Sequence, residues 1–121
     1  MFTCLKPLRP EPYGSLETFR KKEILVKEDF RKSRRIEKYR IGEAAVYIPA
    51  GFAWKYLLLE DIQEVIRGRW FIQSDNGIAP FAMEAPAIRL RFTDGEEILR
   101  LEKQKNAAAL LTLLEEKRKV P

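Results

Sequence analysis

Three arginines late in the chain, Arg89, Arg91 and Arg100, have the types and spacing best suited to a chemical task, the binding of an anion. They alternate with apolar residues in two short runs, 88–92 and 97–101, which flank an Asp-Gly dipeptide. Asp-Gly between alternating runs predicts a type I′ hairpin turn, because that turn needs positive φ at both central positions. In this register Arg89 lies opposite Arg100, and Arg91 lies two residues along on the same surface. Like charges opposite each other destabilise a strand pair, so one hypothesis is a site for a small anion or an acidic peptide.

A second interpretation of the same arginines is structural, and it is the one we favour. Glu96, Glu97, Glu102 or a neighbouring strand would neutralise them. Alternatively, their side chains would lie flat on the sheet with the guanidinium groups in water. Under this interpretation the hairpin is part of the scaffold and binds no ligand.

Catalysis is not expected, because the chain contains no histidine. This excludes Ser-His-Asp and Cys-His nucleophile pairs, His-containing zinc sites and the side chain best suited to acid–base work near neutral pH. The acid pairs Glu60-Asp61 and Glu96-Glu97 lie at expected turns, whereas general acid–base work needs convergent carboxylates. Cys4, the single cysteine, is interpreted as incidental. We therefore predict no catalytic, metal-binding or cofactor-binding residues, and no cofactor.

Positive charge is concentrated in the first third of the chain. The net charge is +5; residues 1–42 hold 12 Lys and Arg against 6 Asp and Glu, whereas residues 43–121 hold 11 against 12. A basic segment ahead of a near-neutral body is compatible with nucleic acid, anionic lipid or an acidic protein as partner. The interpretation that we favour is a solvated face, because acids are interleaved with the bases and specific nucleic-acid binders usually show a stronger surplus.

Apolar and polar residues alternate from about residue 36 onward, which predicts an antiparallel sheet. The expected strands are 36–41, 44–50, 54–59, 64–72, 81–84, 88–92 and 97–101. The short strand 81–84 is expected at a sheet edge because Pro80 and Pro86 bound it. Ahead of the strands, residues 1–14 are predicted to be extended, and 15–33 to be a helix that Ser15 caps.

The last element is predicted to be a helix. Ala107, Leu110, Leu111 and Leu114 form an apolar stripe at helical spacing, and Asn106 is the expected N-cap. Such a helix must cover the open face or end of the preceding sheet. The predicted fold class is therefore mainly β, with six or seven antiparallel strands closed by one C-terminal α-helix.

The second face of the predicted 88–101 hairpin is apolar. In the type I′ register Leu90 lies opposite Leu99, and Ile88 lies opposite Leu101. These four side chains are expected to form one buried face.

The sequence resembles a pleckstrin-homology-like (PH-like) domain of the uncharacterised bacterial type. The resemblance covers residues 36–118 and rests on Tyr39–Glu43 (YRIGE), Ala45–Pro49 (AVYIP), Trp54–Val65 (WKYLLLEDIQEV) and Ile88–Gly95 (IRLRFTDG). It implies two near-orthogonal antiparallel sheets that form a partly open barrel, capped at one end by the helix. The implied organisation is a partly ordered basic N-terminal extension, residues 1–34, followed by a PH-like domain, residues 35–121.

The chain departs from phosphoinositide-binding members of that family. Those members carry basic residues on the first two strands, around a long first loop, whereas here the first connection shrinks to Gly42-Glu43. The expected second strand, 44–50, contains no Lys or Arg, so Lys38 and Arg40 have no basic partners across the turn. A polyphosphate headgroup needs several converging charge-assisted donors, so the usual lipid pocket is not expected.

These observations predict a non-enzymatic, cytoplasmic interaction module that binds a protein or peptide by a strand edge or by a groove beside the C-terminal helix. The chain's own N-terminal arm, or a second copy in a homodimer, is a further candidate for that edge. The alternative is binding of nucleic acid or acidic lipid headgroups through the basic segment 20–40, which would weaken steeply with salt. Neither a signal peptide nor an apolar run of the roughly 20 residues that cross a bilayer is present in the sequence.

Overall fold

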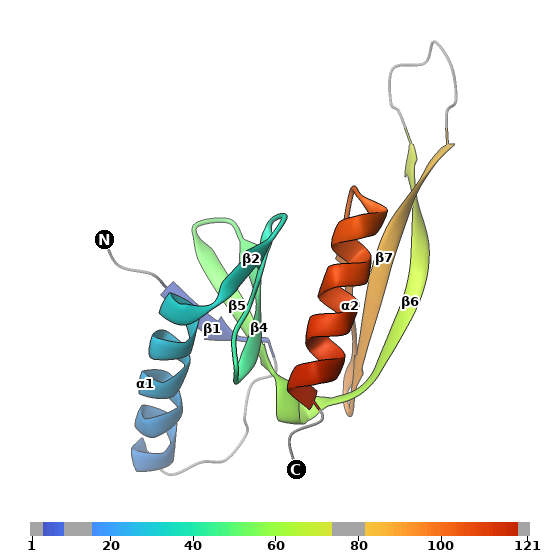
Figure 1. The fold of residues 1–121 in the computed structure, drawn as a ribbon. Coiled ribbons are helices and arrows are strands. Elements are labelled where there is room, and N and C mark those ends of the chain that lie inside the picture. The colour runs from blue at the N-terminus through green and yellow to red at the C-terminus, as the bar shows by residue number, and fades with distance from the viewer. Residues whose placement is uncertain (1–3, 9–15, 74–81, 119–121) are drawn as a thin grey trace.

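Two β-sheets and two helices make up the described part of the chain (Figure 1). A computed structural model describes residues 4–8, 16–73 and 82–118. The elements along the chain are β1 (Cys4–Pro7), α1 (Leu16–Lys32), β2 (Arg34–Ile36), β3 (Tyr39–Ile41), β4 (Ala45–Ala50), β5 (Ala53–Leu58), the 3-10 turn η1 (Leu59–Asp61), β6 (Ile62–Gln73), β7 (Ala82–Phe92), β8 (Gly95–Arg100) and α2 (Gln104–Arg118). The fold is mainly β with a C-terminal helix, which confirms the predicted class.

The strands form a five-stranded and a three-stranded sheet. The first sheet has the order β1-β5-β4-β3-β2, and the second has the order β6-β7-β8. Every neighbouring pair is antiparallel except β1 and β5, which are parallel. Strands β2 to β8 are therefore consecutive and antiparallel, with four in the first sheet and three in the second.

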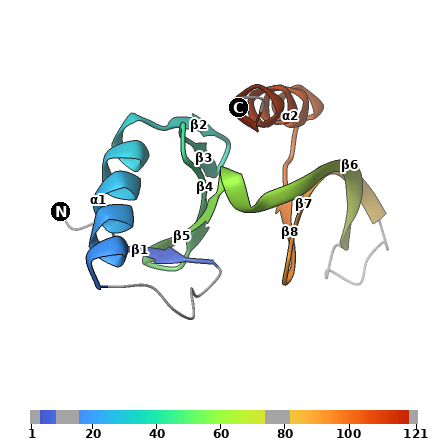
Figure 2. The same cartoon turned by 90° about the horizontal axis from the view of Figure 1, so that it is seen from below.

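The main core lies between the two sheets, and α2 covers one end of the space between them (Figure 2). Its buried side chains are Ile36, Tyr39, Ile41, Val46, Ile48, Leu57, Leu59, Ile62, Ile88, Leu90, Leu99, Leu101, Ala107, Leu110 and Leu114. The predicted stripe of α2 is thus confirmed at three of its four positions, and Leu111 is partly buried against the same core. The sheets do not close into a barrel, so the fold is a partly open sandwich capped by a helix.

Helix α1 packs on the opposite face of the first sheet, and its range confirms the predicted helix. Ser15, the predicted cap, lies outside the described residues. Val26 of α1 is buried with Tyr47 and Leu58 of the sheet. The Phe30 ring meets the rings of Tyr47 and Trp54 edge-on, at 5.0 and 5.2 Å between centroids. Because the sheet is covered on both faces, four consecutive residues of β4 from Ala45 onward are all buried, which is why its sequence is apolar without alternation.

The N-terminal arm occupies one edge of the first sheet, as one of the sequence-based alternatives proposes. Strand β1 runs parallel to β5 with Cys4 opposite Ala53 and Pro7 opposite Tyr56. Beyond the strand, the Leu8 N–H donates to the Tyr56 carbonyl at 2.9 Å. The arm therefore covers backbone groups that β5 would otherwise expose at this edge.

The predicted strand 36–41 is wrong in its first half, because the chain turns between two strands there. Ile36 pairs with Tyr39 across the turn, and Arg34 pairs with Ile41. Glu37 in the turn has a φ of 53°, the left-handed region that few residues other than glycine adopt. The alternation from residue 36 onward is compatible with a single strand, so the pattern does not reveal this turn.

The predicted register of the β7–β8 hairpin is also wrong. The turn residues are Thr93-Asp94, and Phe92 pairs with Gly95, so each partner on β8 lies two residues earlier than expected. Among the described residues other than glycine only Glu37 has a positive φ, so Asp94 does not adopt the type I′ conformation. A shift of two residues keeps every side chain on its face. The predicted buried face therefore forms, although Ile88 pairs with Leu99 and Leu90 pairs with Glu97.

Of the predicted edge strand 81–84, Phe81 lies outside the described residues, and the rest belongs to β7, which runs unbroken from Ala82 through Pro86 to Phe92 in the middle of its sheet. The Pro86 carbonyl accepts a hydrogen bond from the Leu101 N–H at 3.0 Å, beyond the last paired residue of β8, Arg100. In a strand the N and C=O of one residue point to the same side, so the missing N–H of Pro86 faces the carbonyl of Leu101. That carbonyl accepts a hydrogen bond from the Trp70 indole N–H instead, at 3.2 Å, so no acceptor is left unsatisfied by the proline.

Candidate anion-binding groove

The β2–β3 turn, the end of β8 and the start of α2 meet at the upper end of the molecule in Figure 1. Glu37 joins them: its carboxylate accepts hydrogen bonds from the backbone N–H of Glu102 at 2.8 Å and of Lys103 at 3.2 Å. It also accepts one from the side-chain amide of Asn106 at 2.9 Å. Asn106 is therefore not the N-cap that the sequence predicts. The helix begins at Gln104, two residues before Asn106, and a carboxylate from another part of the chain receives the N–H groups ahead of it.

The charge of Glu37 is stabilised by this arrangement. Burial alone would raise the pKa of its carboxyl group, but the hydrogen bonds from Asn106, Glu102 and Lys103, together with the charge of Lys103, lower it overall. A negative charge ahead of a helix N-terminus is also favoured by the helix dipole. Glu37 is thus ionised at neutral pH, with its oxygens already engaged by the start of α2.

A groove of about 480 Å³ opens beside this junction. The residues that line it are Arg35, Glu37, Lys38, Trp70, Arg100, Glu102, Lys103 and Asn106. Four cations therefore face two carboxylates, and one of these two carboxylates is the engaged Glu37. The excess of positive charge makes the groove suited to an anion, because charged donors form the strongest hydrogen bonds to anionic groups.

Two of the cations are held in place by their neighbours. The Arg100 guanidinium lies 5.6 Å from the centroid of the Trp70 ring, and the Trp70 indole N–H donates to the Leu101 carbonyl at 3.2 Å. The Arg35 Nε donates to the Glu37 carbonyl at 2.8 Å. Arranging these groups before a ligand arrives reduces the side-chain entropy lost on binding.

The structure separates the three arginines proposed from the sequence. Arg100 lies in the groove, whereas Arg89 and Arg91 pair with carboxylates outside it: Arg89 with Glu96 at 3.4 Å and Arg91 with Glu64 at 3.3 Å. Arg89 lies opposite Ile98 on β8 rather than opposite Arg100, because of the shifted register. The like-charge pair that suggested the site is therefore not formed.

The edge of the second sheet continues from this groove. On β6, Arg67, Gly68 and Arg69 line a second hollow together with Gln104, which follows the groove residue Lys103 in sequence. The Arg67 guanidinium donates to the Gln104 side chain at 3.0 Å. Positive charge therefore extends from the β2–β3 turn, past the start of α2, to β6.

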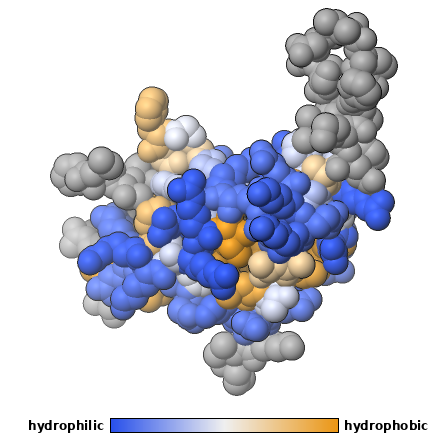
Figure 3. Space-filling view, turned by 45° about the horizontal axis from the view of Figure 1, so that its top comes forward, coloured by the Kyte–Doolittle hydropathy of each residue, from blue (hydrophilic) through white to orange (hydrophobic). Residues whose placement is uncertain are grey.

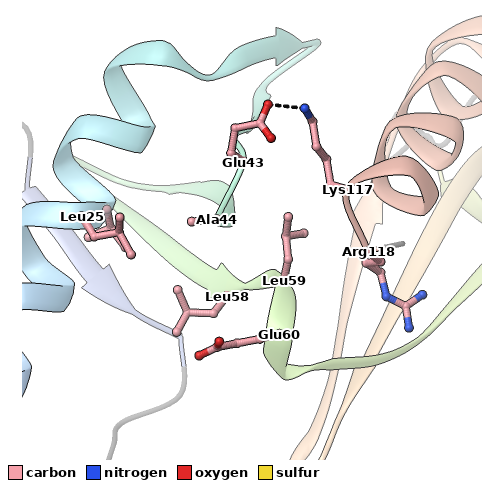
Figure 4. A pocket seen from close by; sticks show the side chains of 9 residues that line it. Leu25, Glu43, Ala44, Leu58, Leu59, Glu60, Lys117 and Arg118 are labelled. Carbon is pink, nitrogen blue, oxygen red and sulfur yellow. Dashed lines mark hydrogen bonds and ion pairs between the residues drawn. The ribbon is translucent and has the colours of Figure 1, made fainter. Parts of the chain in front are cut away.

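Another pocket, of about 260 Å³, lies at the other end of α2 (Figure 4). Leu25, Val26, Ala44, Leu58 and Leu59 supply apolar surface, and Glu43, Glu60, Lys117 and Arg118 supply charges of both signs. Figure 4 shows that Lys117 pairs with Glu43. The Arg118 guanidinium donates to the Ile62 and Gln63 carbonyls at 3.3 and 2.9 Å. Two carboxylates balance two cations here, so this pocket lacks the positive excess of the groove and is a weaker candidate for an anion.

The face that contains the upper end of the molecule is mostly hydrophilic, with an apolar patch in its middle and smaller apolar areas toward one side (Figure 3). Within the described residues, neither helix is long and apolar enough to cross a membrane. Groups of three or more metal-ligating side chains are also missing from residues 4–8, 16–73 and 82–118.

No family model, curated protein or solved structure matches the chain in the comparisons with known proteins. The site therefore has to be interpreted from its own geometry.

Sequence reasoning identified Arg100 but missed its companions in the groove. Arg35 and Lys38 lie in the basic segment 20–40, which the sequence indicates as a candidate anionic-surface contact. Lys103 belongs to neither of the sequence-based hypotheses. Arg35 and Lys38 lie about 65 residues before Arg100 and Lys103 in the sequence. Long-range contacts bring the two segments together, among them the hydrogen bonds of Glu37 to the start of α2 and that of the Arg100 N–H to the Tyr39 hydroxyl. A single acid among the bases of the segment Arg34–Arg40 carries no signal in the sequence of its hydrogen bonds to α2.

Proposed function

We propose that the chain is a non-enzymatic, PH-like interaction module of the cytoplasm that binds an acidic segment of a partner protein in the groove. The order of elements supports its likeness to the PH-like architecture. Four consecutive antiparallel strands, β2 to β5, are followed by three more, β6 to β8, and then by helix α2 over one end. A cytoplasmic setting fits a chain with a single cysteine, which cannot form an internal disulfide.

The observation that carries the proposal is the gathering of Arg35, Lys38, Arg100 and Lys103 around one groove. Carboxylates of a peptide would pair with these cations, and the groove lies at the surface, where an extended chain can enter. Charge complementarity of this kind sets specificity and the association rate more than raw affinity. The expected interaction is therefore fast, of modest strength and sensitive to salt.

The experiment measures binding of a short fluorescent peptide of consecutive glutamates by anisotropy. Lys38→Glu and Arg100→Glu should each weaken binding by about tenfold, which corresponds to about 1.4 kcal/mol. Lys55→Glu makes the same charge change on β5, outside the groove, and should have a much smaller effect. Equal effects of all three substitutions would show that binding follows net charge, and the proposal would be wrong.

A second candidate, an acidic lipid surface, is favoured by one specific observation. Phe52 is fully exposed at the tip of the β4–β5 hairpin, which lies at the same end of the molecule as the β2–β3 turn (Figure 1). An exposed aromatic side chain at the end of a molecule that also carries a basic groove is suited to an anionic membrane interface. Sedimentation with phosphatidylserine-rich vesicles tests it: Phe52→Ser would weaken vesicle binding and leave peptide binding unchanged. If the vesicles bind wild type and Phe52→Ser equally, or not at all, this candidate is excluded.

A further inference from the structure

We propose that the free edge of β6 binds the same acidic segment as an added β-strand, so that the partner lies across both the groove and the second sheet. This inference rests on the proposed function and adds the conformation and the position of the bound segment. Strand addition supplies affinity through main-chain hydrogen bonds, and side chains at alternate positions supply specificity.

β6 presents a long edge. It spans 12 residues and pairs only with β7, and within the described residues no strand lies on its other side. The two sheets differ in this respect, because β1 covers the edge of β5. An edge of this length is normally protected in monomeric proteins.

The first residues of β6 are protected by α2. Arg118 of α2 binds the carbonyls of Ile62 and Gln63, which occupies the start of the strand. Further along, Arg67, Gly68 and Arg69 are exposed. At Gly68 nothing lies within 4 Å of the position that a Cβ would take, so that face of the strand is uncovered.

The charges along β6 identify the chemistry of the added strand. Arg67 and Arg69 are two residues apart, so their side chains lie on the same face of the sheet. An added strand with acids at alternate positions would place carboxylates beside them, since opposite charges on neighbouring strands attract. The edge also adjoins the groove, because Arg67 bonds Gln104 and the preceding residue, Lys103, lines the groove.

A second copy of the chain fits this edge less well. Antiparallel pairing of two β6 strands centred on Gly68 would place Arg67 of one copy opposite Arg69 of the other. Like charges opposite each other are destabilising, so the edge favours a partner of opposite charge.

The test compares two fluorescent peptides, one of alternating Glu and Val and the same peptide N-methylated at alternate residues on one edge. N-methylation keeps the charges and removes N–H donors, so binding to the wild-type chain should weaken about tenfold or more if the peptide forms a strand. Methylation of the other set of alternate residues is the matched control, because a strand at a sheet edge uses only one of its two sides. One methylated peptide should therefore bind much more weakly than the other.

Two further measurements place the peptide. Arg67→Glu should weaken binding of the unmodified peptide about tenfold, whereas Lys55→Glu should not. Amide hydrogen exchange of residues 64–70 should slow when the unmodified peptide is bound.

The outcomes separate the two proposals. If both methylated peptides bind as well as the unmodified one, strand addition is wrong, while a loss of binding in Lys38→Glu would still support the groove. If no acidic peptide binds, both proposals fail. A dimer of the free chain that protects residues 64–70 from exchange would assign the edge to a second copy and overturn the inference.

Discussion

The buried carboxylate of Asp29 accepts a hydrogen bond of 2.7 Å from the hydroxyl of Tyr47, and this contact joins α1 to the middle of the first sheet. The same carboxylate receives the backbone N–H groups of Glu43, Ala44 and Ala45 at 2.7, 3.1 and 3.2 Å. Burial of Tyr47, and its hydrogen bond to the negative Asp29, raise the pKa of the phenol well above its usual range. One acid thus fixes the β3–β4 turn and the helix together.

Replacement of Asp29 by Asn should destabilise the protein strongly. The amide keeps one oxygen but directs an NH2 group toward N–H donors, so buried donors lose their acceptor. We expect a loss of about 2–3 kcal/mol in the free energy of unfolding, measured by urea denaturation. Glu28→Gln, on the exposed neighbour, is the control and should change stability by less than about 0.5 kcal/mol. Similar stabilities for the two variants would contradict the role given to Asp29.

Gly42 and Gly68 should respond in opposite directions to replacement by alanine. A Cβ at Gly42 would overlap the Asp29 carboxylate, whereas a Cβ at Gly68 would meet no atom within 4 Å. Gly42→Ala should cost about 2 kcal/mol through displacement of Asp29. Gly68→Ala should be neutral or should stabilise by up to about 1 kcal/mol, because alanine restricts the unfolded chain. Thermal unfolding of the two variants measures both changes in stability. A Gly42→Ala protein as stable as wild type would show that the Asp29 carboxylate does not pack against Gly42.

The contribution of Glu37 to stability should depend on pH. Its pKa is lowered in the folded protein, so its contribution is complete above the unfolded-state pKa and is lost as the pH falls through the folded-state pKa. Glu37→Gln should therefore lower the Tm at neutral pH, and the difference from wild type should shrink in acid. A Tm difference that stays constant from neutral to acidic pH would contradict the proposed stabilisation of the carboxylate.

The sequence predicts the elements and their buried faces better than their partners. The stripe of Ala107, Leu110 and Leu114 and the faces of the β7–β8 hairpin follow from local periodicity, which survives a two-residue error in register. The type I′ prediction fails because the Asp-Gly preference is statistical, and the chain turns one residue earlier in the strand pair.

Features set by distant contacts are not visible in the sequence. Glu37 adopts a positive φ in a turn where its carboxylate meets α2, and its partners lie 65 to 69 residues away. Pro86 is tolerated in a central strand because the carbonyl that its missing N–H would face, that of Leu101, bonds the Trp70 indole instead. The groove has the same origin: its cations are individually ordinary, and tertiary packing alone makes them a site.

Two leucines of α2 should differ in their effect on stability. Leu110 is fully buried, whereas Leu113 is only partly buried against the core. Leu110→Ala should cost about 2–5 kcal/mol, through lost burial and the cavity left behind. Leu113→Ala should cost less, on the order of 1 kcal/mol. Urea denaturation of both variants tests the orientation of α2, and a larger loss for Leu113→Ala would mean that the helix presents a different face.

Removal of residues 1–8 should expose the edge of β5 and weaken the first sheet. The deletion removes the parallel pairing of β1 with β5 and the contacts of Leu5 and Leu8 with the cores. We expect a Tm lower by at least about 5 °C and concentration-dependent association, because an uncovered strand edge pairs with other chains. A peptide with the sequence of residues 1–8, added in trans, should restore the Tm and the monomer, whereas a peptide with this sequence in reverse order should not. If the deletion leaves both the Tm and the sedimentation behaviour unchanged, β1 does not protect the edge of β5.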